Sequence, residues 1–394
     1  MSMVKENVVY MDNNATTRVA PEVVSEMMPY LTDFYGNPSS MHTFGGQVGQ
    51  ALKTARKRVA DLLGADPEEI TFTSCGTESD STAILSALQA YPDKRHIITT
   101  RVEHPAVKNL CDTLDTLTGH KHRITRLKVD PEGMLNLEEY EAALSEDTAI
   151  VSVMWANNET GVIFPIAEMA RMAKERGILF HTDAVQAVGK IPINLKELDV
   201  DFLSLSGHKL HAPKGVGVLY VKRGTIFTPF LTGGHQERGR RGGTENVASI
   251  VGLGQACLLV AEKMTEENTR VKMLRDKLED GLLATVPKSL LNGHKTERLP
   301  NTCNISFEYV EGEAILLHMN KHNICASSGS ACTSGSLEPS HVLRAMGVPF
   351  TAAHGSIRFS LSIYNTEEEI DFVLEKMPAI IESLRQMSPF WPGD

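Results

Sequence analysis

The chain has 394 residues, of which 42% are hydrophobic and 22% charged, with 30 glycines and 18 prolines. These fractions are close to those of ordinary soluble proteins, and they exclude disordered and collagen-like chains. The 39 Lys and Arg against 49 Asp and Glu give a net charge of −10 at pH 7. That balance repels polyphosphates and argues against nucleic acid as the main ligand.

No uninterrupted apolar stretch approaches the roughly 18 residues of a membrane span, and the first residues, MSMVKENVVYMDNN, lack the apolar core of a signal peptide. We therefore expect a cytosolic (cytoplasmic) protein with no membrane partner. Six cysteines without CxxC spacing give little support for a disulfide framework or a zinc ribbon. The length favours two domains, at about one domain per 150 residues.

Between residue 66 and about residue 222, short β-rich runs alternate with stretches of helical periodicity. The runs are EITFTS, HIITT, HRITRLKV, TAIVSVMW, ILFHTD, VDFLSLS and GVGVLYV. This alternation is typical of an α/β sheet. In one unit, a helix is predicted over 166–176, Gly177 ends it, and ILFHTD follows as a buried strand. Because open α/β sheets bind ligands outside the carboxyl ends of their strands, polar residues there are the first candidates for a site.

The rest of the chain predicts a smaller α+β unit. Residues 247–286 have an unusually long helical pattern, which indicates a helix pair or one long connecting helix. NTCNISFEY and SIRFSLS are strand candidates, and Thr366 is a candidate N-cap for a last helix that begins with three glutamates. The segment 326–336, ASSGSACTSGS, consists of small residues and predicts a mobile loop.

Lys209 directly follows the apolar strand VDFLSLS and precedes a turn rich in Gly and Pro. On spacing alone, a solvated loop lysine is favoured at about two to one, because lysine usually extends to water. The alternative is a Schiff-base lysine. Desolvation and nearby cations make the amine of such a lysine nucleophilic, so that it bonds to the aldehyde of pyridoxal phosphate. The residues at neighbouring strand ends must decide between the two.

Two strand ends carry groups that suit the ring of such a cofactor. Asp183, at the end of ILFHTD, can pair with the ring nitrogen and keep it protonated, with Gln186 near the phenolic oxygen. Asp183 can equally cap a following helix, AVQAVG. His104, after HIITT, can stack on the ring and relay protons, although a lone histidine is more often structural. Their joint placement favours the cofactor.

Two further segments suit its phosphate. After TFTSC, the helix that opens at Gly76 and Thr77 presents backbone N–H groups to an anion, although an ordinary capped helix has the same sequence. Ser206 and His208 can complete this phosphate site from the strand before Lys209.

Cys332 lies within the small-residue segment, where a mobile exposed thiolate is suited to nucleophilic sulfur transfer. Cys325, seven residues earlier, follows an apolar residue and is predicted to be packed. His318, His322 and Cys325 have a spacing that could bind a metal, but no second cluster supports it, and we expect no metal site.

Arginines at two places could bind anions. Arg358 on the strand SIRFSLS could bind a substrate carboxylate through two hydrogen bonds, or it could form an internal ion pair. The segment ERGRRGGTEN has three arginines within four positions. It is interpreted as an anion-binding loop rather than a nucleic-acid patch, because aromatic residues are not interleaved.

Five long motifs together resemble those of the cysteine desulfurases: TSCGTESDSTAI, MWANNETG, HTDAVQAVGK, SGHKLHAPKGVGVLY and SSGSACTSGSLEPSH. The likeness extends from DNNATT at residues 12–17 to the final helix. GNPSSMH, GGHQERGRRGGTEN and SSGSACTSGS are most similar to the NifS, or nitrogen-fixation, type, with the housekeeping IscS type as a near relative.

The resemblance implies an α/β, fold-type I, pyridoxal-phosphate-dependent transferase of the aminotransferase class V kind that forms a homodimer. We expect a large cofactor-binding α/β domain over 16–262. A smaller α+β domain over 1–15 and 263–394 would carry the Cys332 loop.

The resemblance also implies roles for individual residues. Lys209 would bond to pyridoxal 5'-phosphate, His104 would stack on the ring and Cys332 would be the nucleophile that carries a persulfide. Thr244 would reach the phosphate of the neighbouring subunit's cofactor, and Asn158 and Arg358 would bind the substrate. The cofactor-binding residues would be Gly76, Thr77, His104, Asn158, Asp183, Gln186, Ser206, Gly207, His208, Lys209 and Thr244.

The activity implied is the conversion of L-cysteine to L-alanine, which leaves the sulfur on Cys332. The sulfur would serve iron-sulfur cluster assembly in nitrogenase maturation, and a NifU-like scaffold would accept it. A housekeeping sulfur donor or a selenocysteine lyase is the alternative, the latter less favoured because the Cys332 loop has the long NifS and IscS form. An aminotransferase or β-eliminating lyase on the same cofactor, and a catalytically silent scaffold, also stay open.

Overall fold

The computed structural model describes residues 8–116, 122–328 and 339–393. Its larger sheet has seven strands in the order β2-β8-β7-β6-β5-β3-β4. The strands are β2 (Ile70–Thr73), β3 (His96–Thr100), β4 (Arg123–Leu127), β5 (Thr148–Ser152), β6 (Leu179–Asp183), β7 (Phe202–Ser206) and β8 (Gly217–Val221). They coincide with the seven runs predicted from the sequence, and all but the edge strand β4 are buried along their whole length.

The strand directions bring several loops to one edge of this sheet. β7, β6, β5, β3 and β4 are parallel neighbours. β8 is antiparallel to both β7 and β2, so β2 has the same direction as the parallel set. The carboxyl ends of six strands therefore lie at the same edge of the sheet.

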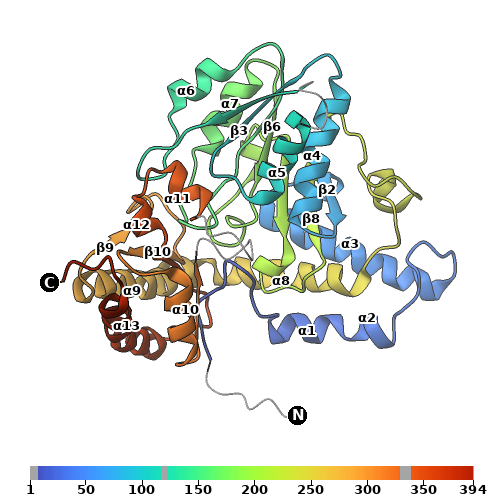
Figure 1. The fold of residues 1–394 in the computed structure, drawn as a ribbon. Coiled ribbons are helices and arrows are strands. Elements are labelled where there is room, and N and C mark those ends of the chain that lie inside the picture. Colours follow the sequence, from blue (N-terminus) through green and yellow to red (C-terminus); the bar gives the residue numbers. More distant parts are fainter. Residues whose placement is uncertain (1–7, 117–121, 329–338, 394) are drawn as a thin grey trace.

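Helices cover both faces of the large sheet (Figure 1). Ile97 and Ile150 pack with α4 (Gly76–Ala90) and α5 (Pro105–Thr116), whereas Ile98 and Val151 belong to the cluster on the other face. This alternation follows from the two-residue period of a strand. The other helices of this part are α1 (Pro21–Met27), α2 (Pro29–Thr32), α3 (Thr43–Leu63), α6 (Leu137–Ala143) and α7 (Ile166–Lys174).

The smaller sheet has the order β12-β13-β10-β9, beside a two-stranded pair β1-β11. Its strands are β1 (Val9–Tyr10), β9 (Ser289–Leu291), β10 (Thr302–Phe307), β11 (Ile324–Cys325), β12 (Ser327–Ser328) and β13 (Ser356–Ser360), and its helices are α10 (Gly312–Asn320), α11 (His341–Ala345), α12 (Phe350–Ala353) and α13 (Glu367–Met387). Both predicted strands are present, as β10 and β13. Thr366 caps α13 as expected, since its hydroxyl accepts from the N–H of Glu369 at 3.3 Å.

Part of the segment predicted as a mobile loop is instead a strand. Ser327 and Ser328 form β12, which pairs with Arg358 and Ile357 of β13. Small residues give no strand signal of their own, so this pairing is imposed by the neighbouring strand. Residues 329–336 of the segment, Cys332 among them, lie outside the described residues.

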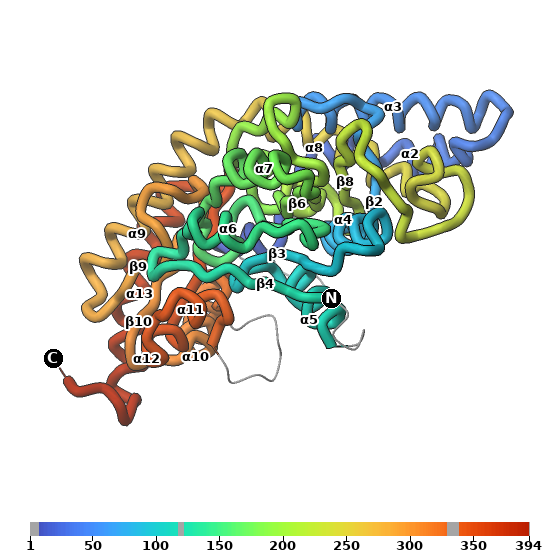
Figure 2. The backbone as a smooth tube through the Cα atoms, turned by 90° about the horizontal axis from the view of Figure 1, so that it is seen from above, coloured from blue at the N-terminus to red at the C-terminus, as the bar shows by residue number. Residues whose placement is uncertain are grey.

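One long helix runs along the lower side of the molecule (Figure 1), and Figure 2 shows that it extends from the large-sheet elements to the small-sheet elements. α8 (Val247–Glu266) continues through a π-helical turn, η5 (Glu267–Val271), into α9 (Lys272–Thr285), so the helix pair left open by the sequence is a single helix. In the described part of the chain, Val247–Thr285 is long and apolar enough to cross a membrane, but 61% of its most apolar window is buried inside the molecule. Core packing therefore accounts for its composition.

The long helix joins two apolar clusters. α8 contributes Ile250, Leu253 and Ala256 to the cluster of the large sheet, and α9 contributes Leu274 and Leu278 to that of the small sheet. The predicted boundary at residue 262 falls near the end of α8. The two clusters agree with a division close to that point, and its position stays a prediction.

Candidate active site

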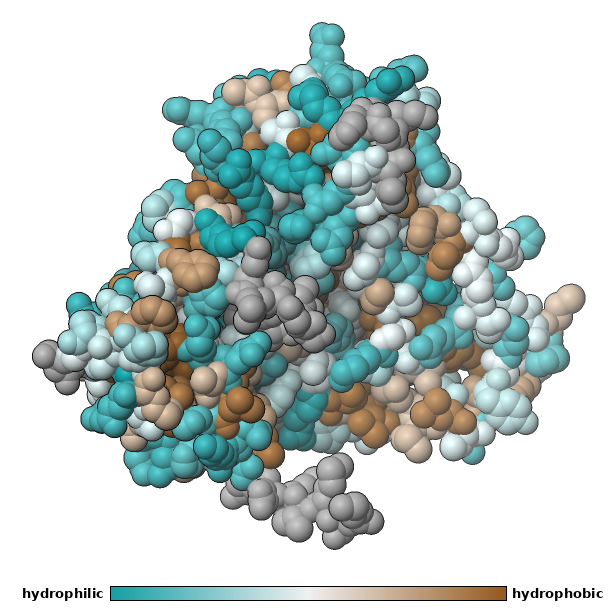
Figure 3. All heavy atoms as spheres, in the orientation of Figure 1, coloured by the Kyte–Doolittle hydropathy of each residue, from teal (hydrophilic) through white to brown (hydrophobic). Residues whose placement is uncertain are grey.

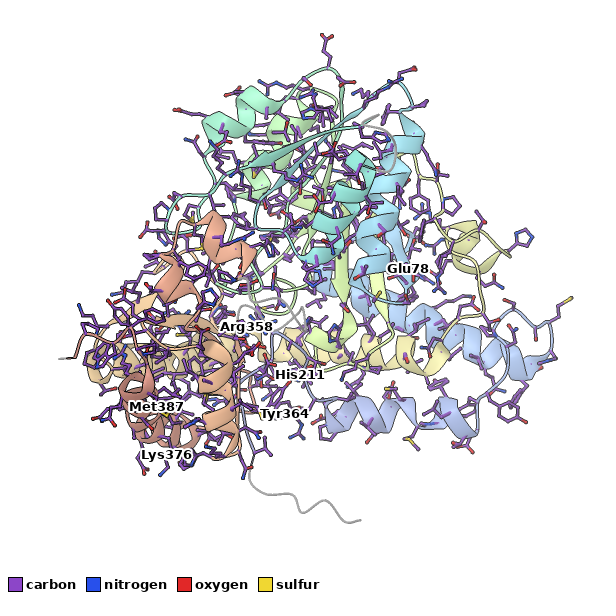
Figure 4. All side chains as sticks on the ribbon, in the orientation of Figure 1. Glu78, His211, Arg358, Tyr364, Lys376 and Met387 are labelled. Carbon is purple, nitrogen blue, oxygen red and sulfur yellow. The ribbon has the colours of Figure 1, made fainter. Side chains whose placement is uncertain are left out.

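A cavity of about 490 Å³ lies at the carboxyl ends of the large-sheet strands and is closed on one side by the small sheet. Ten of the predicted site residues line it: Gly76, Thr77, His104, Asn158, Asp183, Gln186, Ser206, His208, Lys209 and Arg358. β12 contributes Ser327 and Ser328 to the wall. Figure 4 shows Arg358 between the small-sheet elements and the large sheet.

Three predicted site residues are not among those lining this cavity. Gly207 lies between two lining residues in the short turn Gly207–Lys209. Thr244 is exposed on a loop before α8, away from the cavity lining. Cys332 falls outside the described residues.

Lys209 is half-buried, and its amine is held by main-chain carbonyls. Its Nζ donates to the carbonyl oxygens of Asn14 at 2.5 Å and of Ala15 at 2.7 Å. Burial, together with the nearby cations Arg358 and Lys190, lowers the pKa of this amine to about 7. At neutral pH a substantial fraction of Lys209 is uncharged, as a nucleophilic amine must be.

Asp183 lies at the end of β6 and is 5% exposed. Burial, together with the neighbouring carboxyl of Asp80, raises the pKa of its carboxyl to about 7. Its Oδ1 accepts the N–H of Val185 at 2.9 Å. Residues 185–190 form turns rather than the helix AVQAVG, so Asp183 tightens a turn and caps no helix there.

Two more carboxyl groups lie beside Asp183 and were missed by the sequence reasoning. Glu103 accepts the hydroxyl of Thr100 at 2.8 Å and the N–H of Met154 at 3.1 Å through Oε1. Its Oε2 has no partner among the described residues, and burial raises the pKa of Glu103 to about 8. Burial likewise raises the pKa of Asp80, on the second turn of α4, to about 7. The sequence signals that could have found them are that Glu103 adjoins His104 and that Asp80 lies on the helix that begins at Gly76.

The histidines of the site are neutral near pH 7. Burial lowers the pKa of His208 to about 4 and also lowers the pKa of His104, which the charge of Asp183 raises in part. His104 accepts the N–H of Ala106 through Nδ1 at 3.2 Å. This contact fixes the ring at the start of α5.

The start of α4 is packed so closely that only glycine fits at its first residue. A Cβ on Gly76 would lie 2.8 Å from the Cγ2 atom of Val185. The side chain of Glu78 turns back to accept the N–H of Ser74 at 2.8 Å and pairs with Arg241 at 3.0 Å (Figure 4). Gly76 and Thr77, the first two residues of α4, line the cavity, so the start of this helix is available to an anion there.

The predicted anion-binding loop binds the chain itself. Arg241 pairs with Glu78, and Arg238 and Arg240 donate to the carbonyl oxygen of Glu68 at 3.1 and 3.0 Å. Arg238 also donates to the carbonyl oxygen of Ile70 at 2.7 Å. These contacts fasten the loop to the start of β2 and to α4.

Arg358 takes part in the internal ion pair that the sequence left open. Its Nη2 lies 2.8 Å from Oδ1 of Asp12, and its Nη1 donates to the carbonyl oxygen of Asn158 at 3.0 Å. The Nε atom is buried and has no partner among the described residues. A free donor thus remains beside the cavity.

Fold and site together define an α/β enzyme with a reactive lysine at the strand ends. Residues 9–373 match the family model described as Aminotransferase class-V. The chain is 63% identical over 387 residues to "Cysteine desulfurase NifS" of Azotobacter vinelandii, covering 98% of this chain and 96% of that protein.

Two solved structures are similar over most of their length. "NIFS-LIKE PROTEIN" is 40% identical with a TM-score of 0.89, over 96% of this chain and 100% of that one. "SspA in complex with cysteine" is 34% identical with a TM-score of 0.80, over 91% and 99%. The chain therefore belongs to the aminotransferase class-V family and, within it, to the cysteine desulfurases.

Pyridoxal phosphate is the cofactor of this family and of this chain. The cavity fits it, since an amine of lowered pKa, a buried carboxyl group and a helix start face one space. Oε1 of Gln186 is also buried without a partner among the described residues, while its Nε2 donates to Asn14. An orphaned polar atom in the wall indicates that a polar ligand completes the site.

The raised pKa of Glu103 predicts a pH-dependent stability difference. The folded-state pKa of about 8 exceeds the ordinary pKa of 4.5 for a glutamate, so the folded protein holds a proton that the unfolded chain has lost. Stability due to Glu103 is then present below about pH 4.5 and lost as the pH rises towards 8. Glu103→Gln, which keeps the side-chain shape, should become more stable relative to the unsubstituted protein over this range.

The measurement is urea unfolding of both cofactor-free proteins between pH 5 and pH 8, the range set by the shift. We expect the difference in unfolding free energy to change by up to about 1.4 kcal/mol per pH unit. Other titrating groups are common to both proteins and cancel. Parallel stability curves would show that Glu103 is ionised in the folded protein.

Proposed function

We propose that this protein removes the sulfur atom of L-cysteine, giving L-alanine and a persulfide on Cys332. The observation that supports this function most directly is that Lys209 and Asp183 line one cavity. The wall of that cavity also includes Ser328 of β12. Cys332 follows Ser328 by four residues, and four residues span at most about 14 Å. The relative named for cysteine desulfurase activity and the solved relative in complex with cysteine support the substrate.

In this proposal the chain's own groups hold the cofactor and the substrate. The amine of Lys209 would hold the cofactor through its aldehyde and would take the proton from Cα of the substrate. The carboxylate of Asp183 would keep the ring nitrogen protonated, and His104 would lie against the ring. When bound, the cofactor supplies an electron sink for the bonds at Cα.

The remaining groups bind the two ends of the ligands. Arg358 exchanges part of its contact with Asp12 for the substrate carboxylate, and Asn158 lies beside it. The phosphate is bound by backbone and side-chain donors of two strand ends, namely Gly76, Thr77, Ser206, Gly207 and His208. The amide of Gln186 lies near the phenolic oxygen.

The sulfur step is balanced without an external oxidant. The thiolate of Cys332 attacks the sulfur of the substrate, so an S–S bond forms as the Cβ–S bond breaks. The electron pair of the broken bond goes to Cβ, which takes a proton and becomes the methyl group of alanine. The persulfide then serves iron-sulfur cluster assembly in the cytoplasm, for nitrogenase maturation with a NifU-like scaffold as acceptor, which the NifS name of a relative supports.

A homodimer is the proposed assembly, and exposed apolar side chains support it. Met28, Leu31 and Tyr35 are 48%, 60% and 75% exposed, and Ile226 and Phe230 are 55% and 48% exposed. Brown residues gather over α1 and α2 at the lower right of Figure 3. Large exposed apolar patches mark interaction surfaces. Thr244 lies on the loop that continues from Phe230 and would reach the partner's phosphate from this side.

The first test of this function compares two cysteines. Cys332→Ala should keep the cofactor but lower alanine formation on the order of a hundredfold or more, because the nucleophile acts after the substrate has bonded to the cofactor. Cys325→Ala is the matched control and should change the rate less than about twofold, because Cys325 is half-buried in β11 and does not line the cavity.

The products made from L-cysteine and the visible absorption of the cofactor check this expectation. If the Cys325 variant were inactive and the Cys332 variant normal, the nucleophile would be wrongly assigned. Pyruvate and ammonia as the main products would show that the enzyme is a β-eliminating lyase and not a desulfurase.

The shared site can be tested by mixing two inactive subunits. In a heterodimer of Lys209→Ala and Thr244→Ala chains, one site carries both changes and the other carries neither. Activity should therefore return to as much as one intact site per mixed dimer, provided that the Thr244→Ala homodimer is impaired. A mixture no more active than the average of its parents would disprove the shared site.

A further inference from the structure

Residues 222–246, between β8 and α8, form a long surface loop that carries Thr244. Figures 1 and 2 show this 222–246 loop standing out beyond β2. Of its residues, all of which the structure describes, Glu237 alone is buried, with 7% of its surface exposed. Burying a carboxylate is costly unless it is paired and hydrogen-bonded, so a buried Glu237 in a surface loop calls for a reason.

The carboxylate of Glu237 is bound at both oxygens. Arg56 of α3 donates to Oε2 from Nη1 at 2.7 Å and to Oε1 from Nη2 at 2.6 Å. The Oε2 atom also accepts the N–H of Phe72 in β2 at 2.8 Å. The side chains of Arg56 and Glu237 are 13% and 4% exposed. Because such two-point arginine–carboxylate pairs combine strength with a fixed geometry, Glu237 attaches the 222–246 loop firmly to α3 and β2.

The backbone at this attachment is strained. Glu237 has φ 48° and ψ 34°, and Arg238 has φ 59° and ψ 34°. This is the left-handed region, which residues with a Cβ atom rarely adopt. Strained residues persist only where their surroundings impose the conformation, and they cluster at functional sites. The pair between Glu237 and Arg56 supplies that constraint, so removal of the carboxylate should let the turn relax.

The strained turn is connected to Thr244 through a close crossing of the loop with itself. Gly242 donates its N–H to the carbonyl oxygen of Leu231 at 2.8 Å. A Cβ on Gly242 would lie 2.6 Å from the Cα atom of Gly233, so the two limbs of the loop pack backbone against backbone. Glu237 lies in the turn between the two limbs, and Thr244 comes two residues after Gly242. A turn that relaxes therefore shifts the limb that carries Thr244.

We propose that Glu237 is a positioning residue for the cofactor of the other subunit: its pair with Arg56 holds the 222–246 loop so that Thr244 reaches the phosphate in the partner's site. This inference rests on the proposed function, in which Thr244 completes that site. A loop held in place beforehand binds more tightly, because less conformational freedom is lost on binding. A change at Glu237 should therefore weaken the partner's site and leave the site of its own chain intact.

The competing explanation is an effect within one chain. Glu237 contacts β2 at Phe72, and the same stretch of chain continues to Gly76 at the start of α4, which lines the cavity. A mixed dimer separates the two explanations, because the changed loop and the reacting lysine can be placed on the same chain or on different chains.

The experiment measures cofactor binding at Lys209 alone. Full-length chains with two different tags are purified as mixed dimers without cofactor, titrated with pyridoxal phosphate and reduced with borohydride. The label on the Lys209 peptide is then quantified by mass spectrometry. In a dimer of Lys209→Ala and Glu237→Gln chains, the one remaining Lys209 belongs to the Glu237→Gln chain and faces the unchanged loop of the other chain. A second mixed dimer uses Arg56→Gln, which removes the other half of the pair.

The Glu237→Gln and Arg56→Gln homodimers should need on the order of tenfold more cofactor for half-maximal labelling, the size expected when a charged hydrogen bond is lost. Both mixed dimers should return to the value of the unsubstituted protein. The matched control is Glu279→Gln, which breaks a buried pair with Arg298 at 2.7 Å in the small-sheet part. Its homodimer should be labelled normally.

Unchanged labelling of both homodimers, mixed dimers as weak as the homodimers, or equal weakening by Glu279→Gln would overturn the inference. A mixed dimer of Lys209→Ala and Thr244→Ala chains distinguishes this from failure of the proposed function. If that dimer is labelled normally while the Glu237→Gln mixed dimer is not, the shared site stands and only the role of Glu237 is wrong. If the Thr244→Ala mixed dimer stays weak, the shared site itself is wrong, and the role of Glu237 falls with it.

Discussion

The amine of Lys209 is held by the carbonyl oxygens of Asn14 and Ala15, and the geometry of the site depends on this contact. The same N-terminal segment is attached to the small sheet, because the N–H groups of Asn13 and Asn14 bond to the carbonyl and hydroxyl of Ser360. One short stretch of chain therefore positions the lysine of the large sheet against the wall formed by the small sheet. Each of these buried polar groups would cost about 1–3 kcal/mol if it were left unpaired. The contacts therefore hold the large sheet and the small sheet in one relative position.

Burial at the strand ends also adjusts the charges in the site. Parallel strands bring Asp183 and Lys209 to one edge, and the low polarity there moves both pKa values to about 7. Lys209 can then lose a proton while Asp183 can hold a negative charge opposite a protonated ring. In water the amine would stay protonated near neutral pH, so burial is what makes the uncharged state of Lys209 accessible; an exposed Asp183 would already be ionised.

The architecture and most of the site could be predicted from the sequence. Seven β-rich runs gave the large sheet, and polar residues at their ends, such as His104 and Asp183, line the cavity. Periodicity could not identify Glu103 or Asp80, because what distinguishes them is tertiary burial rather than spacing. β12 was missed for a related reason, since its two serines are a strand only through their pairing with β13.

Transfer of the sulfur atom to Cys332 is the central claim, and mass spectrometry of the cofactor-loaded protein after treatment with L-cysteine tests it most directly. The account predicts a mass increase of one sulfur atom that a reducing agent removes, located on the peptide that contains Cys332. An unchanged protein mass, or the added sulfur on Cys325 or another cysteine, would contradict it.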